Sequence, residues 1–166
     1  MIHEWRKGEH VVSTDRSRID AATVKRFLDL TYWAAGIPLD VVERSLDRAI
    51  SFGVHHEPSG SLVGVARVIT DAATFAYLSD VWIEPGHRGR GLSRFLMESI
   101  LAHPELQGLR RFMLATKDAH ALYARFGFAA MAKPDWWMEI VDPDPYGLNP
   151  PPTTPPPPHP PRPPGS

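Results

Sequence analysis

The sequence predicts an α/β or α+β layer fold in which helices cover a mixed sheet. Segments with apolar residues at helical spacing alternate along the chain with segments whose apolar residues recur every second position. A Pro58-Ser59-Gly60 turn between two strand-like segments indicates a hairpin. A long strand-like segment over 75–83 ends at Pro85 and Gly86, and an amphipathic helix follows at once. This order indicates one layered domain.

The sequence of the first half of the chain predicts two helices and four strands. We expect a short strand over 10–13 and a helix over 20–32, with Asp20 as its N-cap. A second helix is expected from Pro38 to Ile50, because proline suits the first turn of a helix. The expected strands that follow span 52–57, 62–69 and 75–83.

The second half predicts two helices and two strands. A helix is expected over 91–103, with Pro104 beyond its end, and a strand over 111–116. A short helix over 118–126 should be capped by Asp118, and a final strand should span 137–141.

The prolines divide the chain into a domain, residues 1–141, and a tail, residues 142–166. Of the 18 prolines, 13 lie between Pro143 and Pro164. Such a segment lacks backbone donors and large apolar side chains, so we expect a disordered, extended polyproline tail. The stretch from Pro160 to Pro164 could dock a proline-recognising domain, or the tail could be a solvated extension that chemistry does not need.

Composition excludes several function classes. The chain has 166 residues, 18 Lys and Arg against 19 Asp and Glu, and no cysteine. A neutral domain argues against a nucleic-acid or membrane-surface partner, and the absence of cysteine excludes thiolate metal sites and cysteine nucleophiles. The histidines lack the spacing of metal ligands, so no metal is expected. We expect a soluble, cytoplasmic protein without a signal peptide or membrane span.

The most informative segment is Arg88-Gly89-Arg90-Gly91-Leu92-Ser93, which joins a strand to a helix. Two glycines let the backbone approach a ligand, and free N–H groups with the helix dipole favour an anion. The nucleotide P-loop would need Lys and Ser or Thr after its last glycine, and the dinucleotide fingerprint fails because Arg94 stands where its third glycine belongs. A plain strand-turn-helix is the alternative to a pyrophosphate cradle.

This loop resembles the coenzyme A loop of the GNAT superfamily of N-acetyltransferases, Q/R-x-x-G-x-G/A, except that Ser93 stands at its last place. The stretch from Leu122 to Phe128 is similar to the family's L-Y-x-x-x-G-F block. The resemblance covers about 12–141 and implies a mostly antiparallel sheet with splayed central strands and four flanking helices. Two departures are Thr116, where the family often has Asn, and Arg110-Arg111, where some members place a Glu base.

The resemblance implies acetyl-CoA as the acyl donor, held by the loop and by the strand before it. The implied coenzyme A contacts are Val81, Trp82, Ile83, Arg88, Gly89, Arg90, Gly91, Leu92, Ser93, Arg94, Thr116 and Tyr123.

Acyl transfer to an amine needs a proton for the leaving thiolate, and the phenol of Tyr123 is the expected general acid. The alternative is that Tyr123 is a core residue that packs its helix on the sheet. Asp80 interrupts an apolar strand and is expected as a base, an amine-binding group or a structural carboxylate. Glu84 and His120 are weaker candidates for the base.

The resemblance implies that the segment between the first two helices borders the acceptor pocket, and its aromatic side chains suit a cationic amine or an apolar acceptor. The alternative is that Tyr32 and Trp33 end a helix and cover the core. The candidate substrate contacts are Tyr32, Trp33, Phe75, Tyr77 and His120. We expect direct transfer in a ternary complex to a small, amino-acid-like amine. Protein N-termini or lysines, a longer acyl donor, and a non-catalytic acyl-CoA-binding module with a docking tail remain alternatives. A homodimer is also open.

Overall fold

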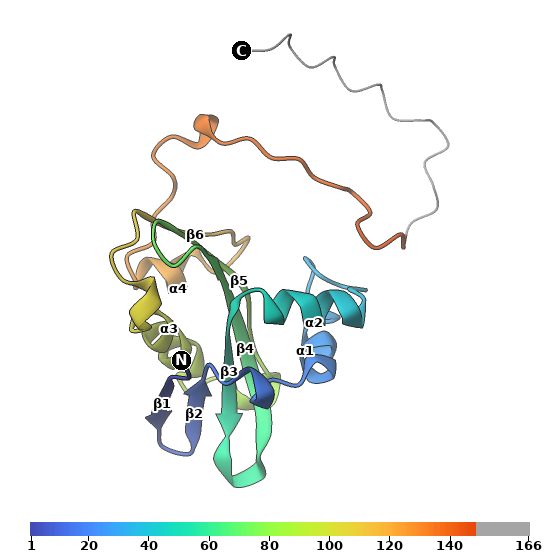
Figure 1. Cartoon of the computed structure of the whole chain (residues 1–166), viewed down its shortest axis with the longest axis vertical. Helices are drawn as coiled ribbons and strands as arrows, with labels where there is room; N and C mark the ends of the chain where they lie inside the picture. The colour runs from blue at the N-terminus through green and yellow to red at the C-terminus, as the bar shows by residue number, and fades with distance from the viewer. Residues whose placement is uncertain (149–166) are drawn as a thin grey trace.

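Six strands form one sheet in the computed structural model of the chain, which describes residues 1–148. They are β1 (Glu4–Lys7), β2 (His10–Ser13), β3 (Ile50–His56), β4 (Ser61–Thr70), β5 (Phe75–Ile83) and β6 (Arg111–Leu114). The strands lie side by side in sequence order (Figure 1). Neighbouring strands are antiparallel except for β5 and β6, which are parallel.

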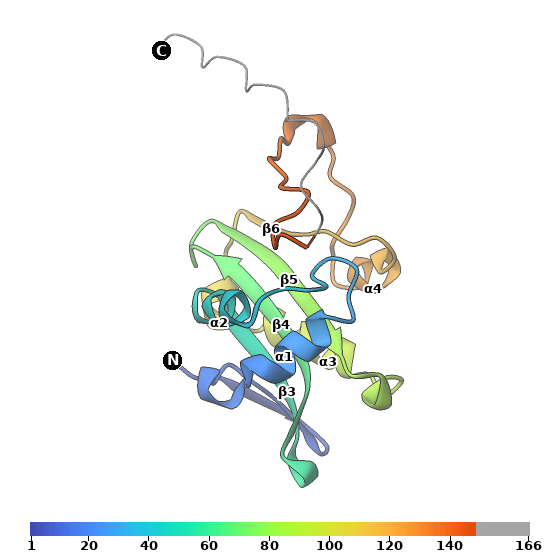
Figure 2. The same cartoon turned by 90° about the vertical axis from the view of Figure 1, so that its right-hand side faces the viewer.

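Helices cover both faces of the sheet (Figures 1 and 2). One face carries α1 (Ala21–Leu28) and α2 (Leu39–Asp47), and the other carries α3 (Leu92–Leu101) and α4 (His120–Ala124). Each face has its own apolar core, because α1 and α2 pack around Val65 while α3 packs around Phe52 and Leu78. The mixed, mostly antiparallel sheet with four helices confirms the predicted fold class.

Most predicted elements are present with ends shifted by a few residues, and Asp20 caps α1 as expected, accepting a hydrogen bond from the Thr23 N–H at 2.8 Å. The strand β1 was not predicted, because its charged sequence lacks an apolar alternation. The predicted cap at Asp118 is wrong. The hydroxyl of Thr116 accepts the Ala119 N–H at 3.0 Å instead, so α4 begins only at His120.

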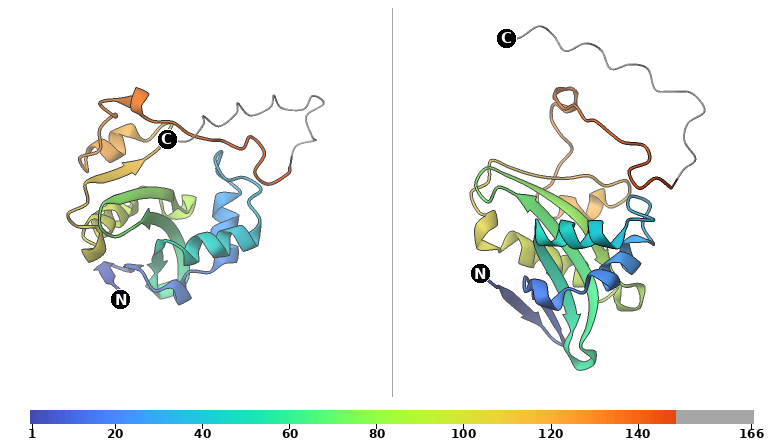
Figure 3. Two further views of the ribbon diagram at one scale, coloured as in Figure 1. Left: turned by 45° about the horizontal axis from the view of Figure 1, so that its top comes forward. Right: turned by 45° about the vertical axis from the view of Figure 1, so that its right-hand side comes forward.

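The predicted final strand over 137–141 is wrong for the described chain. A 3-10 turn at Pro134–Trp136 precedes this segment, and residues 137–141 form no regular structure. The chain instead runs away from the sheet toward the loop between α1 and α2 (Figure 3). Tyr146 packs against the core beneath α1 and α2, so the predicted tail begins with residues that contact the domain. The predictions for 149–166 lie outside the described residues.

A β-bulge in β5 determines which way its polar residue points. Val65 pairs with Trp82 and Arg67 with Ser79, so Asp80 and Val81 of β5 together oppose the single residue Ala66 of β4. Asp80 adopts a left-handed φ of 54°, which aspartate tolerates better than bulky residues do. Ala76 and Leu78 point into the α3 core, and strict alternation would send Asp80 there as well. The bulge turns its carboxylate to the opposite face.

On that face Asp80 forms an ion pair with Arg67 at 2.5 Å, and both side chains are largely buried. The other carboxylate oxygen of Asp80 accepts a hydrogen bond from Trp33 Nε1 at 3.2 Å. A buried carboxylate is tolerable when it is paired and hydrogen-bonded, as it is here. The pair therefore fixes the bulge and ties the loop after α1 to the sheet.

The first prediction follows from this pair. Replacing Arg67 with leucine leaves the buried Asp80 carboxylate without its cation, so unfolding should become easier by about 3 kcal/mol. Urea denaturation measures this change. The matched control is Arg44→Leu, which removes an exposed ion pair to Asp40 and should change stability by less than about 1 kcal/mol. Equal stabilities of the two variants would show that the Arg67–Asp80 pair does not hold the bulge.

Three histidines, His10, His55 and His103, are buried, and burial lowers the pKa of each below its usual value. The ring of His10 also lies 5.1 Å from that of His56 and 5.8 Å from that of His87, and these neighbours lower its pKa further. All three side chains are therefore held neutral in the folded protein.

The second prediction concerns acid stability. Because the folded-state pKa values are depressed, the unfolded chain binds more protons, so stability is full above about pH 6.5 and falls as the pH drops below it. The urea midpoint should therefore decrease between pH 7.5 and pH 5.5, before carboxylates titrate. A midpoint that stays constant over this range would contradict the neutral, buried state of the three imidazoles.

Candidate active site

The loop between β5 and α3 has the backbone that an anion site needs. A 3-10 turn, Pro85–His87, follows the strand, and Gly89 and Gly91 then adopt left-handed φ values of 74° and 75°. Glycine adopts this conformation without the steric cost that a side chain brings. Gly91 directly precedes the first residue of α3 and serves as its N-cap without a side chain.

Consecutive backbone N–H groups of this loop are free. The N–H of Arg88 donates to the Pro85 carbonyl at 3.2 Å, and that of Phe95 donates to the Gly91 carbonyl at 3.0 Å. The N–H groups of residues 89–94 between them have no acceptor in the part of the chain that the structure describes. Unpaired N–H groups and the positive end of the α3 dipole favour a negatively charged ligand at this point.

The space around the loop is open. A Cβ placed on Gly89 would meet no atom within 4 Å, and one on Gly91 would meet only Lys7 Nζ, at 3.9 Å. The ammonium group of Lys7 also lies 5.8 Å from the centre of the Phe95 ring, so β1 contributes a cation to the loop. Local sequence patterns do not indicate Lys7, because β1 itself was not predicted and the pairing of distant strands brings Lys7 to the loop.

The loop arginines have different surroundings. Arg88 turns back on the strand: its Nε donates to the Ile83 carbonyl at 2.8 Å, and its guanidinium lies 4.7 Å from the centre of the Trp82 ring. Arg94 donates to Glu98 at 2.7 Å within α3. Arg90 is exposed and forms no ion pair with a described residue. Both arginines are exposed, but Arg88 fastens the loop to β5, whereas Arg90 makes no such contact with β5.

The strands β5 and β6 separate beside this loop. Pairing between β5 and β6 covers only Phe75 to Leu78 against Arg111 to Leu114. From Ser79 onward β5 has no partner on that side among residues 1–148, so the strands separate where the bulge begins. Val81, Trp82 and Ile83 thus lie on a strand with one unpaired edge, which leads directly to the loop.

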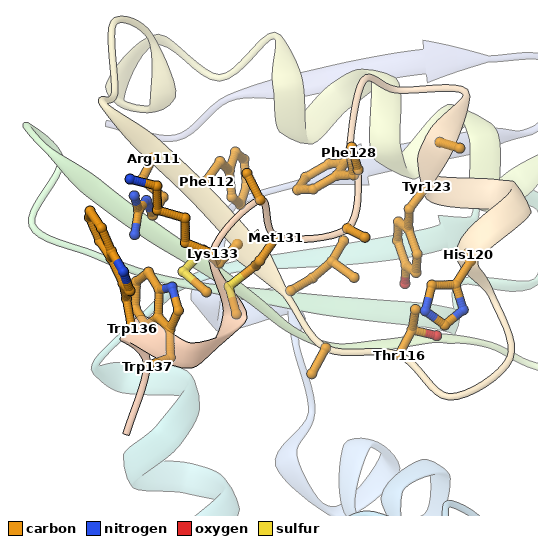
Figure 4. A pocket seen from close by; sticks show the side chains of 17 residues that line it. Arg111, Phe112, Thr116, His120, Tyr123, Phe128, Met131, Lys133, Trp136 and Trp137 are labelled. Carbon is orange, nitrogen blue, oxygen red and sulfur yellow. The ribbon is translucent and has the colours of Figure 1, made fainter. Parts of the chain in front are cut away.

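Tyr123 lies on α4 beside a hollow of about 1070 Å³ that runs along β6. His120 and Thr116 line the same end of the hollow (Figure 4). Burial raises the pKa of the Tyr123 phenol above its usual value, and the charge of Asp118 adds to this effect. The phenol therefore stays protonated at neutral pH and can donate a proton.

Two of the predicted acceptor residues, Tyr32 and Trp33, lie together in the loop after α1. Tyr32 and Trp33 contact each other edge to face at 5.0 Å, and the Lys117 ammonium lies 5.6 Å from the Tyr32 ring. Trp33 also donates a hydrogen bond to Asp80, so this aromatic pair lies beside the bulge of β5.

The structure does not bring Phe75 and Tyr77 to the bulge. They lie five and three residues before Asp80 on an extended strand, so they are about 16 Å and 10 Å away along β5. Both carboxylate oxygens of Asp80 already accept hydrogen bonds, one from Arg67 and one from Trp33.

Within residues 1–148, no cluster of three or more His, Asp or Glu is arranged to hold a metal ion. No helix of this described part is long and apolar enough to cross a bilayer.

The chain was compared with known families and proteins. The acetyltransferase (GNAT) family profile matches residues 16–128. A Gibberella zeae protein, named provisionally as an acetyltransferase, is 33% identical over 142 residues, which cover 73% of this chain and 79% of that protein.

Solved structures give the same assignment. The crystal structure of a protein from Xanthomonas campestris, provisionally described as an acetyltransferase of the GNAT family, is 49% identical with a TM-score of 0.80, covering 85% of this chain and 99% of that one. A Clostridium acetobutylicum structure, described as a predicted acetyltransferase with acetyl-CoA, is similar in fold at 14% identity, with a TM-score of 0.56 and coverage of 85% and 96%. The chain belongs to the acetyltransferase (GNAT) family and is an acyltransferase.

Proposed function

We propose that this acyltransferase moves the acetyl group of acetyl-CoA to a primary amine of a small, amino-acid-like molecule, by direct attack in a ternary complex. The observation that carries the proposal is the loop at Gly89 and Gly91, whose free N–H groups lie at the end of the strand that parts from β6. A pyrophosphate on the loop would place its attached arm along the unpaired edge of β5.

The coenzyme would be held by backbone more than by side chains. The N–H groups of residues 89–94 suit pyrophosphate oxygens, and Arg90 and Lys7 add positive charge. The unpaired edge at Val81 to Ile83 can bond the amides of the pantetheine arm as a further strand would. The contacts predicted for Trp82, Leu92, Ser93, Arg94 and Thr116 stay predictions; the Thr116 hydroxyl already accepts a hydrogen bond from the Ala119 N–H.

Tyr123 is the proposed general acid. Attack of the amine nitrogen on the thioester carbonyl forms the new C–N bond, and collapse of the adduct breaks the C–S bond. The Tyr123 phenol, with its raised pKa, remains protonated and delivers a proton to the leaving sulfur. No covalent acyl-enzyme is required, and the chain has no cysteine to form a thioester.

The neutral fraction of the amine attacks the thioester, and the nitrogen of the adduct then releases one proton to water. Asp80 already accepts hydrogen bonds from Arg67 and Trp33, so we assign it a positioning role rather than that of the base. The role of Asp80 is thus to position Trp33 in the acceptor wall. The exposed rings of Tyr32 and Trp33 offer faces on which an ammonium group can rest before deprotonation. His120 lies on the same side of the hollow as Tyr123 and is a second candidate contact.

Two alternatives differ in acceptor or in catalysis. A protein N-terminus or lysine would use the same donor site, and an acceptor screen with thiol-release detection separates it from small amines. A non-catalytic acyl-CoA-binding module would bind the donor without turnover.

The cytoplasmic location stays a prediction.

The third prediction tests the loop. Gly91→Glu should abolish acetyl-CoA binding, because it adds bulk at a φ of 75° and repels phosphate charge. Calorimetric titration of each purified variant measures the affinity. Gly91→Gln separates bulk from charge, and Gly91→Ala carries the same backbone strain but adds only a Cβ, 3.9 Å from Lys7 Nζ. Affinity should fall in the order Ala, Gln, Glu. Wild-type affinity in Gly91→Glu would refute the cradle.

The fourth prediction tests the acid. Tyr123→Phe keeps the ring but removes the proton donor, so kcat should fall by roughly 100-fold. The Kd for acetyl-CoA and the melting temperature should stay near wild type, which distinguishes lost chemistry from lost structure. Undiminished turnover would assign the proton to another donor, and no turnover in the wild-type protein with any amine would favour the binding module.

A further inference from the structure

A row of three side chains crosses β1, β2 and β3 beside the loop between β5 and α3. Lys7 of β1 pairs with His10 of β2, and His10 pairs with His56 of β3. Residues directly opposite one another on antiparallel strands point to the same face of the sheet, so these side chains lie in a line. The rings of His10 and His56 are accordingly in contact, with their centres 5.1 Å apart.

The loop meets this row near both of its ends. At its start, the ring of His87 lies 5.8 Å from that of His10, edge to face, and 5.3 Å from that of His56. At its end, Lys7 Nζ lies 3.9 Å from the position that a Cβ on Gly91 would take. The free N–H groups of residues 89–94 begin two residues after His87. A shift of His87 against the row would therefore move the N–H groups that suit a pyrophosphate.

Two nitrogens in this contact are buried without partners. Neither Nε2 of His10 nor Nδ1 of His87 has a hydrogen-bond partner within residues 1–148. His10 as a whole is only 8% exposed. A charged imidazole carries a proton on both nitrogens, so Nε2 of a charged His10 would be a buried donor without an acceptor.

The surroundings of His10 also oppose a positive charge. Burial lowers the pKa of His10, the neighbouring His56, His87 and Arg90 lower it further, and Glu9 raises it. Each of the other two rings has a carboxylate beside it, at 3.6 Å for His56 and 4.0 Å for His87, but His10 forms no ion pair within residues 1–148. The charged groups that face the three rings are Lys7, Glu9, Glu84 and Arg90.

We propose that His10 is a positioning residue for the coenzyme loop, and that a proton on His10 separates the loop from β2 and lowers the affinity for acetyl-CoA. Neutral rings let His87 pack on the row. A charged His10 would repel Arg90 and Lys7 and leave its Nε2 donor unpaired, so the loop moves away to expose the ring to water. The inference rests on the proposed function, because it concerns the same coenzyme site.

The direction of the pH effect follows from which state of the loop binds the proton. In the separated state His10 titrates near its ordinary pKa of about 6.5, whereas the packed loop keeps its pKa lower. Acetyl-CoA needs the packed loop, so its affinity is highest above this pH and falls as the pH drops below it. One imidazole accounts for at most about tenfold per pH unit, so the Kd should rise about three- to tenfold between pH 7.5 and pH 5.5.

Calorimetric titration of the full-length protein with acetyl-CoA over this pH range tests the proposal. His10→Phe keeps an aromatic ring and loses no hydrogen bond at Nε2, but it cannot take up a proton. Most of the pH-dependent rise in Kd should therefore disappear in this variant. The coenzyme's own phosphate also titrates near pH 6, but it does so with both proteins, so the difference between them isolates His10. Circular dichroism at each pH shows that the titrated protein is folded.

Three further variants complete the comparison. His10→Ala removes the ring and should raise the Kd already at pH 7.5, where His10→Phe should bind more tightly than His10→Ala. His10→Gln is neutral at every pH and gives a second Kd without pH dependence if the phenylalanine does not fit. His103→Phe removes another buried imidazole, two residues beyond the far end of α3, and should keep the wild-type pH dependence of the Kd.

The outcomes separate this inference from the proposed function. An equal rise of the Kd in wild type and His10→Phe would assign the pH dependence to the coenzyme phosphate and overturn the role of His10. A wild-type Kd that is constant, or that falls toward pH 5.5, would also overturn it; a fall would mean that the charged rings attract the phosphates. In each of these cases the coenzyme site itself stands. Failure of acetyl-CoA to bind at any pH would refute that site and this inference together.

Discussion

The geometry of the site depends on one irregularity, the two residues of β5 that oppose one residue of β4. Without that bulge Asp80 would point into the apolar α3 core, where an unpaired carboxylate could not stay. With it, Asp80 meets Arg67 and holds Trp33, so the loop after α1 is fixed against the sheet. The strained φ at Asp80 is offset by this ion pair and hydrogen bond.

The bulge also begins the part of β5 that has no neighbour in β6, and that part leads to the glycine loop. In the proposed site, a single strand therefore supplies the anchor of the acceptor wall, the free backbone edge and the entry to the anion cradle. Tyr123 lies on α4, on the other face of the sheet from α1 and α2 (Figure 1). The proposed catalysis thus depends on where one strand changes face and loses its partner.

The sequence predicted those features that local residues decide. Alternation predicted β5 over 75–83, the Asp20 cap began α1, and Gly89 with Gly91 indicated the loop. Features that depend on distant residues could not be predicted from local sequence. They are Arg67 as the partner of Asp80, Lys7 beside Gly91, and the hydrogen bond from Arg88 to the Ile83 carbonyl. The alternation at 137–141 predicted a strand, but pairing needs a neighbouring edge, and in the described chain Pro134 turns this segment away.

The most direct test of the account is a thermal-shift titration of the wild-type protein with acetyl-CoA, NAD and ATP. A ligand that binds the folded state raises the melting temperature by mass action, and no acceptor needs to be known. The account predicts a saturable rise with acetyl-CoA and none with NAD or ATP at equal concentration. No rise with acetyl-CoA, or an equal rise with all three, would contradict a coenzyme A cradle at Gly89 to Gly91.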